Sequence, residues 1–152
     1  MTEKYEDILN RSWDEIPVPK LLPVGSWLLR GRNVALFPPK EEGQSMRVAF
    51  FYEAKEPMDD VSEKELAELG DDYAYSENDI VKQFFINRNK DWDAVRKHLA
   101  LHGIDGAGKT QADTFKEFKG AEVISYLTTR TFTDASGNTK VDNDPTSFAK
   151  VE

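Results

Sequence analysis

Three segments alternate apolar and polar residues with the two-residue period of a β-strand, and this pattern constrains the fold more than any other feature of the sequence. They are MRVAFFYEA (46–54), DIVKQFFINRN (79–89) and AEVISYLTTRTFTD (121–134), all rich in β-branched and aromatic residues. A fourth segment, SWLLRGRNVALF (26–37), has a similar composition, with Gly31 indicating a bend or bulge. We therefore expect a mainly β protein.

Turns and helices fill the intervals between these strands. PPKEEGQ (38–44) predicts a turn, so the strands on either side of it are expected to pair as a hairpin. KDWDAVRKHLALHG (90–103) has a helical period that ends at Gly103, and TQADTFKEFKG (110–120) predicts a second short helix. After the last long strand, a turn at 135–138 precedes one or two short closing strands.

The predicted order is three strands, a helical insert and two further strands, an α+β arrangement dominated by β-structure. A five-stranded OB-like Greek-key barrel with a helical insert between its third and fourth strands has this order, and other β-meanders also fit it. The 152 residues suffice for one domain with its own core. We assign that domain to residues 25–152. Residues 1–24 are expected to form an N-terminal arm, in which Pro17, Pro19 and Pro23 oppose helix formation.

Composition excludes several classes of protein. The sequence has no cysteine, which excludes disulfides, thiolate metal sites and cysteine nucleophiles and fits a reducing compartment. It has no apolar run long enough to span a membrane, and residues 1–15 are polar where a secretory signal would be apolar. We expect a cytoplasmic protein that makes no membrane contact and needs no cofactor.

Negative charge is concentrated in one segment. The net charge is −8, and residues 56–79 (EPMDDVSEKELAELGDDYAYSEND) hold ten acidic residues and one basic residue, so the rest of the chain is close to neutral. Ser62 and Glu65 stand at capping-box positions before a short helical pattern that ends at Gly70. We interpret the segment as a solvated excursion between two strands, because it lacks the spacing of a calcium loop.

The segment GIDGAGKT (103–110) matches the phosphate-binding pattern G-x-x-x-x-G-K-[ST] at Gly103, Gly108, Lys109 and Thr110. A phosphate-binding loop of this kind joins a buried strand to a helix, whereas a helical pattern precedes Gly103 here. The expected role of the segment is to connect two helices, with Thr110 as the N-cap of the second.

Two histidines are the only ones in the sequence, and they lie four residues apart on the first predicted helix. His98 and His102 have the spacing of a helical metal pair, but no third ligand accompanies them. We expect His98 at the surface and His102 as an imidazolium favoured by the negative end of the helix. No pairing of a nucleophile with a base is visible, so no catalytic residue is expected.

Basic residues recur beside aromatic residues within the predicted strands. By two-residue alternation, three groups of them each share one face of a strand. The groups are Tyr126 with Arg130 and Phe132, Lys82 with Phe84 and Arg88, and Arg47 with Phe51. Aromatic rings stack on bases and cations follow phosphates, which is the chemistry of a surface that binds single-stranded nucleic acid. Aromatic residues in strands also form cores, so both roles stay open for each residue. The candidate binding residues are Trp27, Arg30, Arg32, Arg47, Phe51, Lys82, Phe84, Arg88, Tyr126, Arg130 and Phe132.

The layout of the whole chain carries a resemblance. VGSWLLRGRNV, MRVAFFYEAKEPMDD, VRKHLALHGID, FKGAEV and a long strand closing on the turn DASGN follow one another over most of residues 22–142. This layout resembles that of phage-encoded single-stranded-DNA-binding proteins of the OB type. The resemblance implies a protein that coats unwound DNA during replication and recombination. Many such proteins recruit partners through an acidic C-terminal tail, whereas NDPTSFAKVE here is only mildly acidic and the acidic residues lie internally at 56–79.

Three functions are considered. The first is a non-enzymatic, sequence-tolerant single-stranded-DNA-binding protein of a phage. In this hypothesis the segment 56–79 binds replication or recombination proteins, and the protein can form homo-oligomers. The second is an acidic protein-interaction module, such as an inhibitor of a host DNA-handling enzyme. The third and weakest is a nucleotide-binding enzyme that uses Lys109.

Overall fold

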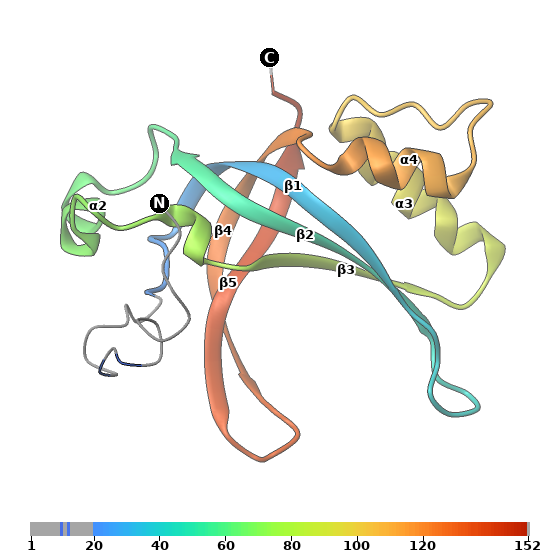
Figure 1. The fold of residues 1–152 in the computed structure, drawn as a ribbon, viewed down its shortest axis with the longest axis horizontal. Helices are drawn as coiled ribbons and strands as arrows, with labels where there is room; N and C mark the ends of the chain where they lie inside the picture. The colour runs from blue at the N-terminus through green and yellow to red at the C-terminus, as the bar shows by residue number, and fades with distance from the viewer. Residues whose placement is uncertain (1–9, 11, 13–19, 152) are drawn as a thin grey trace.

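The computed structural model describes residue 10, residue 12 and residues 20–151, which form a mainly β fold with a few short helices (Figure 1). One antiparallel sheet has the strand order β3-β2-β1-β4-β5. The strands are β1 (Gly25–Phe37), β2 (Met46–Pro57), β3 (Ile80–Ile86), β4 (Glu122–Thr133) and β5 (Thr139–Ala149). The helices are α2 (Glu63–Leu69), α3 (Trp92–Leu101) and α4 (Gln111–Phe118), with the short 3-10 turns η2 (Tyr75–Glu77) and η3 (Asn89–Asp91). The predicted strands, hairpin and helical insert are confirmed.

The sheet has an inner face that carries the core and an outer face that lies opposite. On β2, Val48, Phe50 and Tyr52 point to the inner face and are fully buried. Their neighbours across the sheet, such as Leu29 of β1 and Ile80 of β3, join the same core. Because side chains alternate along a strand, Arg47, Ala49 and Phe51 point to the outer face.

A bend in β1 lets one strand serve both halves of the sheet. Residues 25–30 of β1 pair with β4, while residues 27–37 pair with β2. The register with β2 shifts between Leu28 and Leu29 and again between Gly31 and Asn33, which confirms the bulge predicted at Gly31. Irregularities of this kind increase the twist of a strand, so β1 wraps the sheet around its core.

Helices α3 and α4 cover the inner face at one end of the sheet (Figure 1). Val95 and Leu99 of α3 and Phe118 of α4 are buried against it. α3 ends just before Gly103, whose φ of 78° is left-handed and suits a residue that follows a helix. α4 begins after Thr110, whose side chain accepts a hydrogen bond from the Asp113 backbone, as predicted for an N-cap.

The gap between β3 and β5 is bridged by the residues that precede β1. In residues 20–151, no ladder of backbone hydrogen bonds joins these two edge strands, so the sheet is not a closed barrel. Asn143 of β5 instead holds both backbone groups of Leu22, accepting from its N–H at 3.0 Å and donating to its carbonyl at 2.9 Å. On the other side of the gap, Tyr73 and Asn78 bind the backbone of Lys20.

The predicted N-terminal arm is therefore only partly described, and its last residues belong to the core. Leu22 is buried, and the Trp27 indole donates to the Pro23 carbonyl at 3.0 Å. The amphipathic pattern predicted earlier in the arm lies outside the described residues. β5 was expected as one or two short strands and is a single strand, in which Pro145 is tolerated because β5 lies at an edge.

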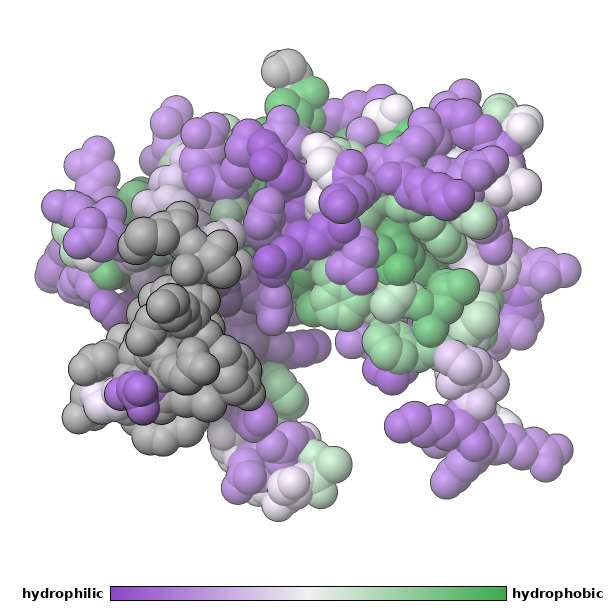
Figure 2. Space-filling model, viewed as in Figure 1, coloured by the Kyte–Doolittle hydropathy of each residue, from purple (hydrophilic) through white to green (hydrophobic). Residues whose placement is uncertain are grey.

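The acidic segment 56–79 connects β2 to β3 and carries α2. Ser62 caps α2 by accepting from the Glu65 backbone, and the helix ends at Gly70, both as predicted. Val61 and Leu69 are buried and fix the segment to the core. α2 lies at one end of the long axis of the molecule and α3 and α4 lie at the other (Figure 1). In the view of Figure 2, hydrophilic residues are exposed at both ends, and a hydrophobic patch lies on the right, below the helices.

Within the part of the chain that the structure describes, no helix combines the length and the apolar character needed to cross a bilayer.

Candidate nucleic-acid interface

Two exposed aromatic rings flank a cation in one row across three strands of the outer face. Phe37 of β1 pairs with Arg47 of β2, which in turn pairs with Phe85 of β3. The Phe37 and Phe85 side chains are 38% and 62% exposed, which is unusual for large apolar residues. The Arg47 guanidinium lies 4.9 Å from the centre of the Phe37 ring, in a cation–π contact. Side chains opposite one another on neighbouring strands are about 5 Å apart, so the row is continuous.

The floor beside this row is built from small residues. Ala35 and Ala49 pair in the next row, and Gln83 of β3 completes it. Arg47 donates to Gln83 at 3.3 Å, and Ala49, which pairs with Gln83, is buried. The Arg47 side chain is therefore held by contacts with both neighbouring strands, Phe37 on β1 and Gln83 on β3. A planar cation and exposed ring faces can contact a phosphate and the stacked bases of an unpaired strand.

The predicted binding residues divide between the two faces of the sheet. The pairing registers confirm the shared faces predicted for β2 and β4, and for Lys82 with Phe84 on β3. On the outer face are Arg30, Arg47, Phe51, Tyr126, Arg130 and Phe132. Lys82 and Phe84 point to the inner face, and Arg88 lies just beyond the end of β3. The eleven candidates therefore do not form one surface.

Trp27 is a core residue and Phe84 is a half-buried residue of the inner face, so neither candidate lies on the outer face. The Trp27 side chain is fully buried and packs edge-on against Tyr75. The Phe84 ring contacts Phe50 and His98 beneath α3. The alternation of a β-strand fits both residues equally well as core residues or as residues that contact a ligand. Only the pairing register shows which face of the strand is covered.

Two of the candidate arginines are neutralised by neighbouring carboxylates. Arg32 pairs with Asp79 at 3.1 Å and lies 3.9 Å from Glu53. Arg130 holds Asp142 through two hydrogen bonds, of 2.9 and 3.3 Å, and these bonds raise the pKa of Arg130 above its ordinary value. In residues 20–151, Arg30, Arg47, Lys82 and Arg88 have no ion-pair partner within 4 Å. Of these four, Lys82 points to the inner face, so Arg30, Arg47 and Arg88 are left to offer charge to a phosphate on the outer face.

Phe37 and Phe85 were not among the sequence candidates. Phe85 is adjacent to Phe84, and alternation alone places the two rings on opposite faces without stating which face is solvent-exposed. Phe37 ends its strand beside two prolines and was assigned to the apolar part of that strand. Phe37 and Phe85 are identified by their pairing with Arg47 across three strands. This pairing is known only when the strands on both sides of β2 are known.

The two histidines are buried beside Tyr52, which corrects their expected exposure and charge. Only 5% of His98 and 9% of His102 is exposed, and both Nε2 atoms lie within hydrogen-bond distance of the Tyr52 hydroxyl, at 2.6 and 2.8 Å. Burial lowers the pKa of His98 to about 3 and also lowers that of His102, because desolvation disfavours the imidazolium. The helix-end effect expected for His102 is outweighed by burial.

The hydrogen-bond directions in this cluster follow from one carbonyl. His102 Nδ1 lies 2.7 Å from the His98 carbonyl, which can only accept, so Nδ1 carries the proton. His102 Nε2 then accepts from the Tyr52 hydroxyl, and that hydroxyl accepts from His98 Nε2–H. Both rings are neutral donors and acceptors in this chain of bonds. Among the described residues, no cluster of three or more His, Cys, Asp or Glu residues could hold a metal ion.

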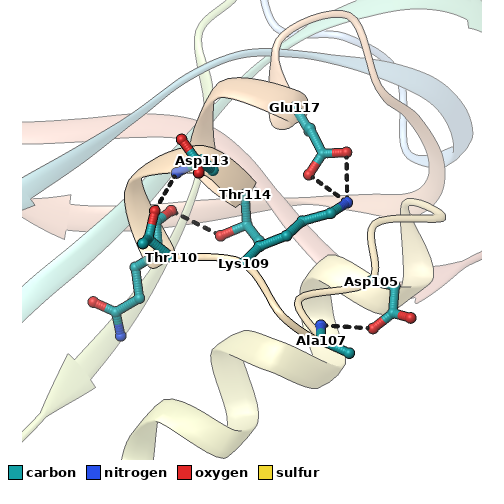
Figure 3. Close-up of polar contacts among 8 residues, drawn as sticks. Asp105, Ala107, Lys109, Thr110, Asp113, Thr114 and Glu117 are labelled. Atoms are coloured by element: carbon teal, nitrogen blue, oxygen red, sulfur yellow. Dashed lines mark hydrogen bonds and ion pairs between the residues drawn. The ribbon is translucent and has the colours of Figure 1, made fainter.

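The GIDGAGKT segment connects two helices and does not follow a strand (Figure 3). Lys109 is held by both oxygens of Glu117, at 3.0 and 3.1 Å, and Thr110 caps α4. Asp105 accepts from the Ala107 backbone within the loop. A cavity of about 380 Å³ lies between this loop and α3, with an apolar lining that includes Trp92 and Phe115. The geometry differs from a phosphate-binding loop, in which a free lysine and a strand-to-helix turn are needed.

No family model matches this sequence, and no curated protein matches it.

Proposed function

We propose that this protein binds single-stranded DNA without strong sequence preference, on the outer face of β1, β2 and β3. The observation that carries the proposal is the row Phe37–Arg47–Phe85, in which two exposed rings flank one cation that has no ion-pair partner among the described residues. Each ring offers a face to a base, and Arg47 offers charge to the intervening phosphate. Arg88, just beyond the end of β3, adds positive charge beside the row, whereas Arg30 lies between Glu53 and Glu122 on the same face.

We also propose that the fold is an OB-like barrel left open at one seam. The strand order β3-β2-β1-β4-β5, with helices inserted between β3 and β4, supports this assignment. In such folds β2 and β3 and the loops at the strand ends contact oligonucleotides. Both long hairpins, β1–β2 and β4–β5, extend beyond the sheet on the same side of the molecule (Figure 1). The row Phe37–Arg47–Phe85 lies at the turn end of the first hairpin, because Phe37 and Arg47 are the last pair before the turn.

The acidic segment does not oppose binding at this row. β2 runs from Met46 beside the row to Pro57 at the start of the acidic segment. Its eleven residue steps correspond to about 35 Å at about 3.3 Å per residue. Charge interactions in solution are screened over about 8–10 Å at physiological salt. Repulsion from 56–79 is therefore weak where the nucleic acid would lie.

A role in the replication or recombination of phage DNA is the biological setting that we propose, and it rests on the sequence resemblance alone. Nothing in the fold requires catalysis for this role, because coating a strand needs affinity and not chemistry. The protein would then act as a non-enzymatic binder in the cytoplasm of the host cell.

Fluorescence anisotropy of a labelled oligo-dT, titrated with the protein at low and moderate salt, tests the proposal. We expect single strands to bind more tightly than duplex of equal length. Contact with three phosphates would weaken binding about 20-fold between 50 and 200 mM salt. Phe85→Ala and Phe37→Ala should each lower the affinity by roughly 5- to 100-fold, the value of one lost stacking contact.

Adjacent residues on the inner face provide matched controls. Leu36→Ala alters an exposed apolar side chain next to Phe37 on the opposite face and should leave binding unchanged. Phe84→Ala should destabilise the fold by about 3 kcal/mol, as expected for a packed ring, whereas Phe85→Ala should not. Absent binding at low salt, or equal losses for Phe85→Ala and Leu36→Ala, would reject the proposed surface. Absent binding would also favour the alternative function, that of an acidic protein-interaction module.

A further inference from the structure

A cationic cavity lies at the helical end of the molecule, and its lining includes no residue of the row Phe37–Arg47–Phe85. Its volume is about 380 Å³, and it is formed by the outer side of α3, the start of the GIDGAGKT loop and the residue after β5. Its charged lining consists of Arg96, Lys97 and Lys150, with Asp105 as the single acid. The Arg96 and Lys97 side chains are 76% and 78% exposed and share one carboxylate, that of Asp93. Two cations on one acid leave unbalanced positive charge at the mouth of the cavity.

The opposite end of the molecule carries the complementary charge. The segment 56–79 has ten acidic residues and one basic residue. Asp71 and Asp72 follow α2 at the surface, and within the described residues neither makes a side-chain hydrogen bond or an ion pair. α2 and α3 lie at opposite ends of the long axis (Figure 1), and hydrophilic side chains are exposed at both ends (Figure 2). Opposite charges at opposite ends make the surface self-complementary between copies.

We propose that the cationic cavity binds the acidic segment of a second copy of this chain, around Asp71 and Asp72. The contact joins two different surfaces, so one copy uses its cavity and the next uses its acidic end. A head-to-tail contact of this kind forms open rows rather than closed dimers unless the rotation between copies closes a ring. The contact leaves the outer face of β1, β2 and β3 free in every copy, because neither surface includes the row Phe37–Arg47–Phe85.

A linear array of copies matches the shape of a single DNA strand. If the proposed DNA-binding function holds, adjacent copies on one strand would reinforce one another, which is cooperative binding. That consequence rests on the proposed function, whereas the contact between copies does not. The exposed charges predict weak association that depends strongly on salt, because ion pairs at a surface are screened.

Sedimentation velocity of the full chain without DNA tests the contact. At 50 mM salt we expect the average mass to rise above the 17.3 kDa of one copy as concentration increases, and to return to that value at 500 mM salt. R96E/K97E and D71K/D72K should each be monomeric, because each removes one of the two surfaces. E41K/E42K, on the turn between β1 and β2, makes the same charge change as D71K/D72K and should associate like the wild type.

A mixture of the two monomeric variants gives the sharpest outcome. R96E/K97E keeps its acidic segment and D71K/D72K keeps its cavity, so equal amounts should form one-to-one dimers that cannot extend. A mixture that stays monomeric, a wild type that is monomeric at low salt, or association that ignores salt would overturn the proposal. Binding of R96E/K97E to an oligo-dT that holds a single copy should equal that of the wild type, so failure of the DNA proposal would be seen separately.

Discussion

The Tyr52 hydroxyl forms hydrogen bonds with two neutral histidines in the core. These hydrogen bonds exist together only while all three groups keep their present protonation states. If His102 gained a proton at Nε2, it could no longer accept from the Tyr52 hydroxyl. The hydroxyl proton would then have no acceptor, which costs about 1–3 kcal/mol at a buried site. The His98 ring also packs against Phe50, Phe84 and Phe148, none of which can stabilise an imidazolium as water does.

These histidines predict that stability falls as the solution becomes acidic. In the unfolded chain a histidine takes up its proton near pH 6.5, whereas burial lowers the pKa of folded His98 to about 3. The unfolded state therefore binds more protons between these values, and the free energy of unfolding decreases as the pH falls through this window. His98 alone should remove about 2–3 kcal/mol at pH 4.5. Urea unfolding followed by tryptophan fluorescence from pH 7.5 to 4.5 measures the effect.

His98→Leu provides the comparison for this prediction. The variant removes one titrating group and leaves the bond from Tyr52 to His102, so its stability should depend less on pH than that of the wild type. The carboxylates of Asp60 and Asp91, whose pKa values are lowered by backbone hydrogen bonds, lose their contribution only below about pH 4. A wild type whose stability is constant from pH 6.5 to 4.5 would contradict the argument.

At this scale the sequence predicted residue chemistry better than residue burial. It placed Ser62 and Thr110 at helix N-termini correctly, because capping depends on residues only three positions apart. It placed His98 at the surface wrongly, because the burial of His98 depends on Tyr52 and Phe148, far away in the chain. A local sequence pattern predicts hydrogen bonds between residues that are close in the chain. It says very little about which distant side chains pack against a residue.

Among the structural elements, β1 and α4 meet at a point where only glycine fits. The Gly31 backbone accepts from Gly120 N–H at 2.9 Å and donates to the Ala121 carbonyl at 2.7 Å, which holds the end of α4 against the strand. A Cβ atom added at Gly31 would contact the Phe118 carbonyl and lie 2.8 Å from the Phe118 ring. No real side chain tolerates that approach, so the helix or the strand would have to move.

Gly31→Ala should therefore lower the free energy of unfolding by about 1–3 kcal/mol, the usual cost of overpacking. Gly106→Ala is the matched control, because an added Cβ there would meet only a Thr114 methyl at 3.6 Å, an ordinary contact. The control should be neutral within about 0.5 kcal/mol. Urea titration of both variants gives the comparison, and equal stability of the two would show that α4 does not need its close approach to β1.

The succession of elements was predictable from the sequence, while their lengths and contacts were not. Period-two and helical patterns predicted every strand and both helices of the insert, because these patterns reflect one buried face. The pattern missed the full length of β5, where polar residues and Pro145 interrupt the alternation. It also missed Phe37 and Phe85 as surface residues, because strand pairing decides the exposed face and pairing is not local.

In the whole molecule, one asparagine holds the seam between β3 and β5. Asn143 satisfies both backbone groups of Leu22 at a buried position, and the second partner of this region, Asn78, lies 3.4 Å from the Asn143 side chain. Asn143→Ala should destabilise the fold by about 1–3 kcal/mol, because the Leu22 N–H and carbonyl would stay buried without partners. Asn33→Ala, at an exposed position of β1, is the control and should be near neutral.

Hydrogen exchange locates this effect. In the Asn143→Ala variant, we expect the amides of residues 20–24 and of η2 to exchange faster, while those shared by β1 and β2 keep their protection. Uniformly faster exchange would mean that the seam is not a separate unit. No pattern in the sequence indicates this seam, because proline-rich segments such as residues 17–23 are usually free arms and Asn143 stands in a polar stretch.

The bond between Leu22 and Asn143 joins residues 121 positions apart in the chain. Closing so long a loop carries a large entropic cost and is repaid only when the rest of the sheet is in place, so the seam closes late in folding. During synthesis on the ribosome, β1, β2 and β3 can pair long before β5 emerges. Until β5 is synthesised, the nascent protein therefore lacks the hydrogen-bond partner of Leu22 and has two unpaired strand edges. At this stage a chain of this topology is most exposed to aggregation and to chaperones.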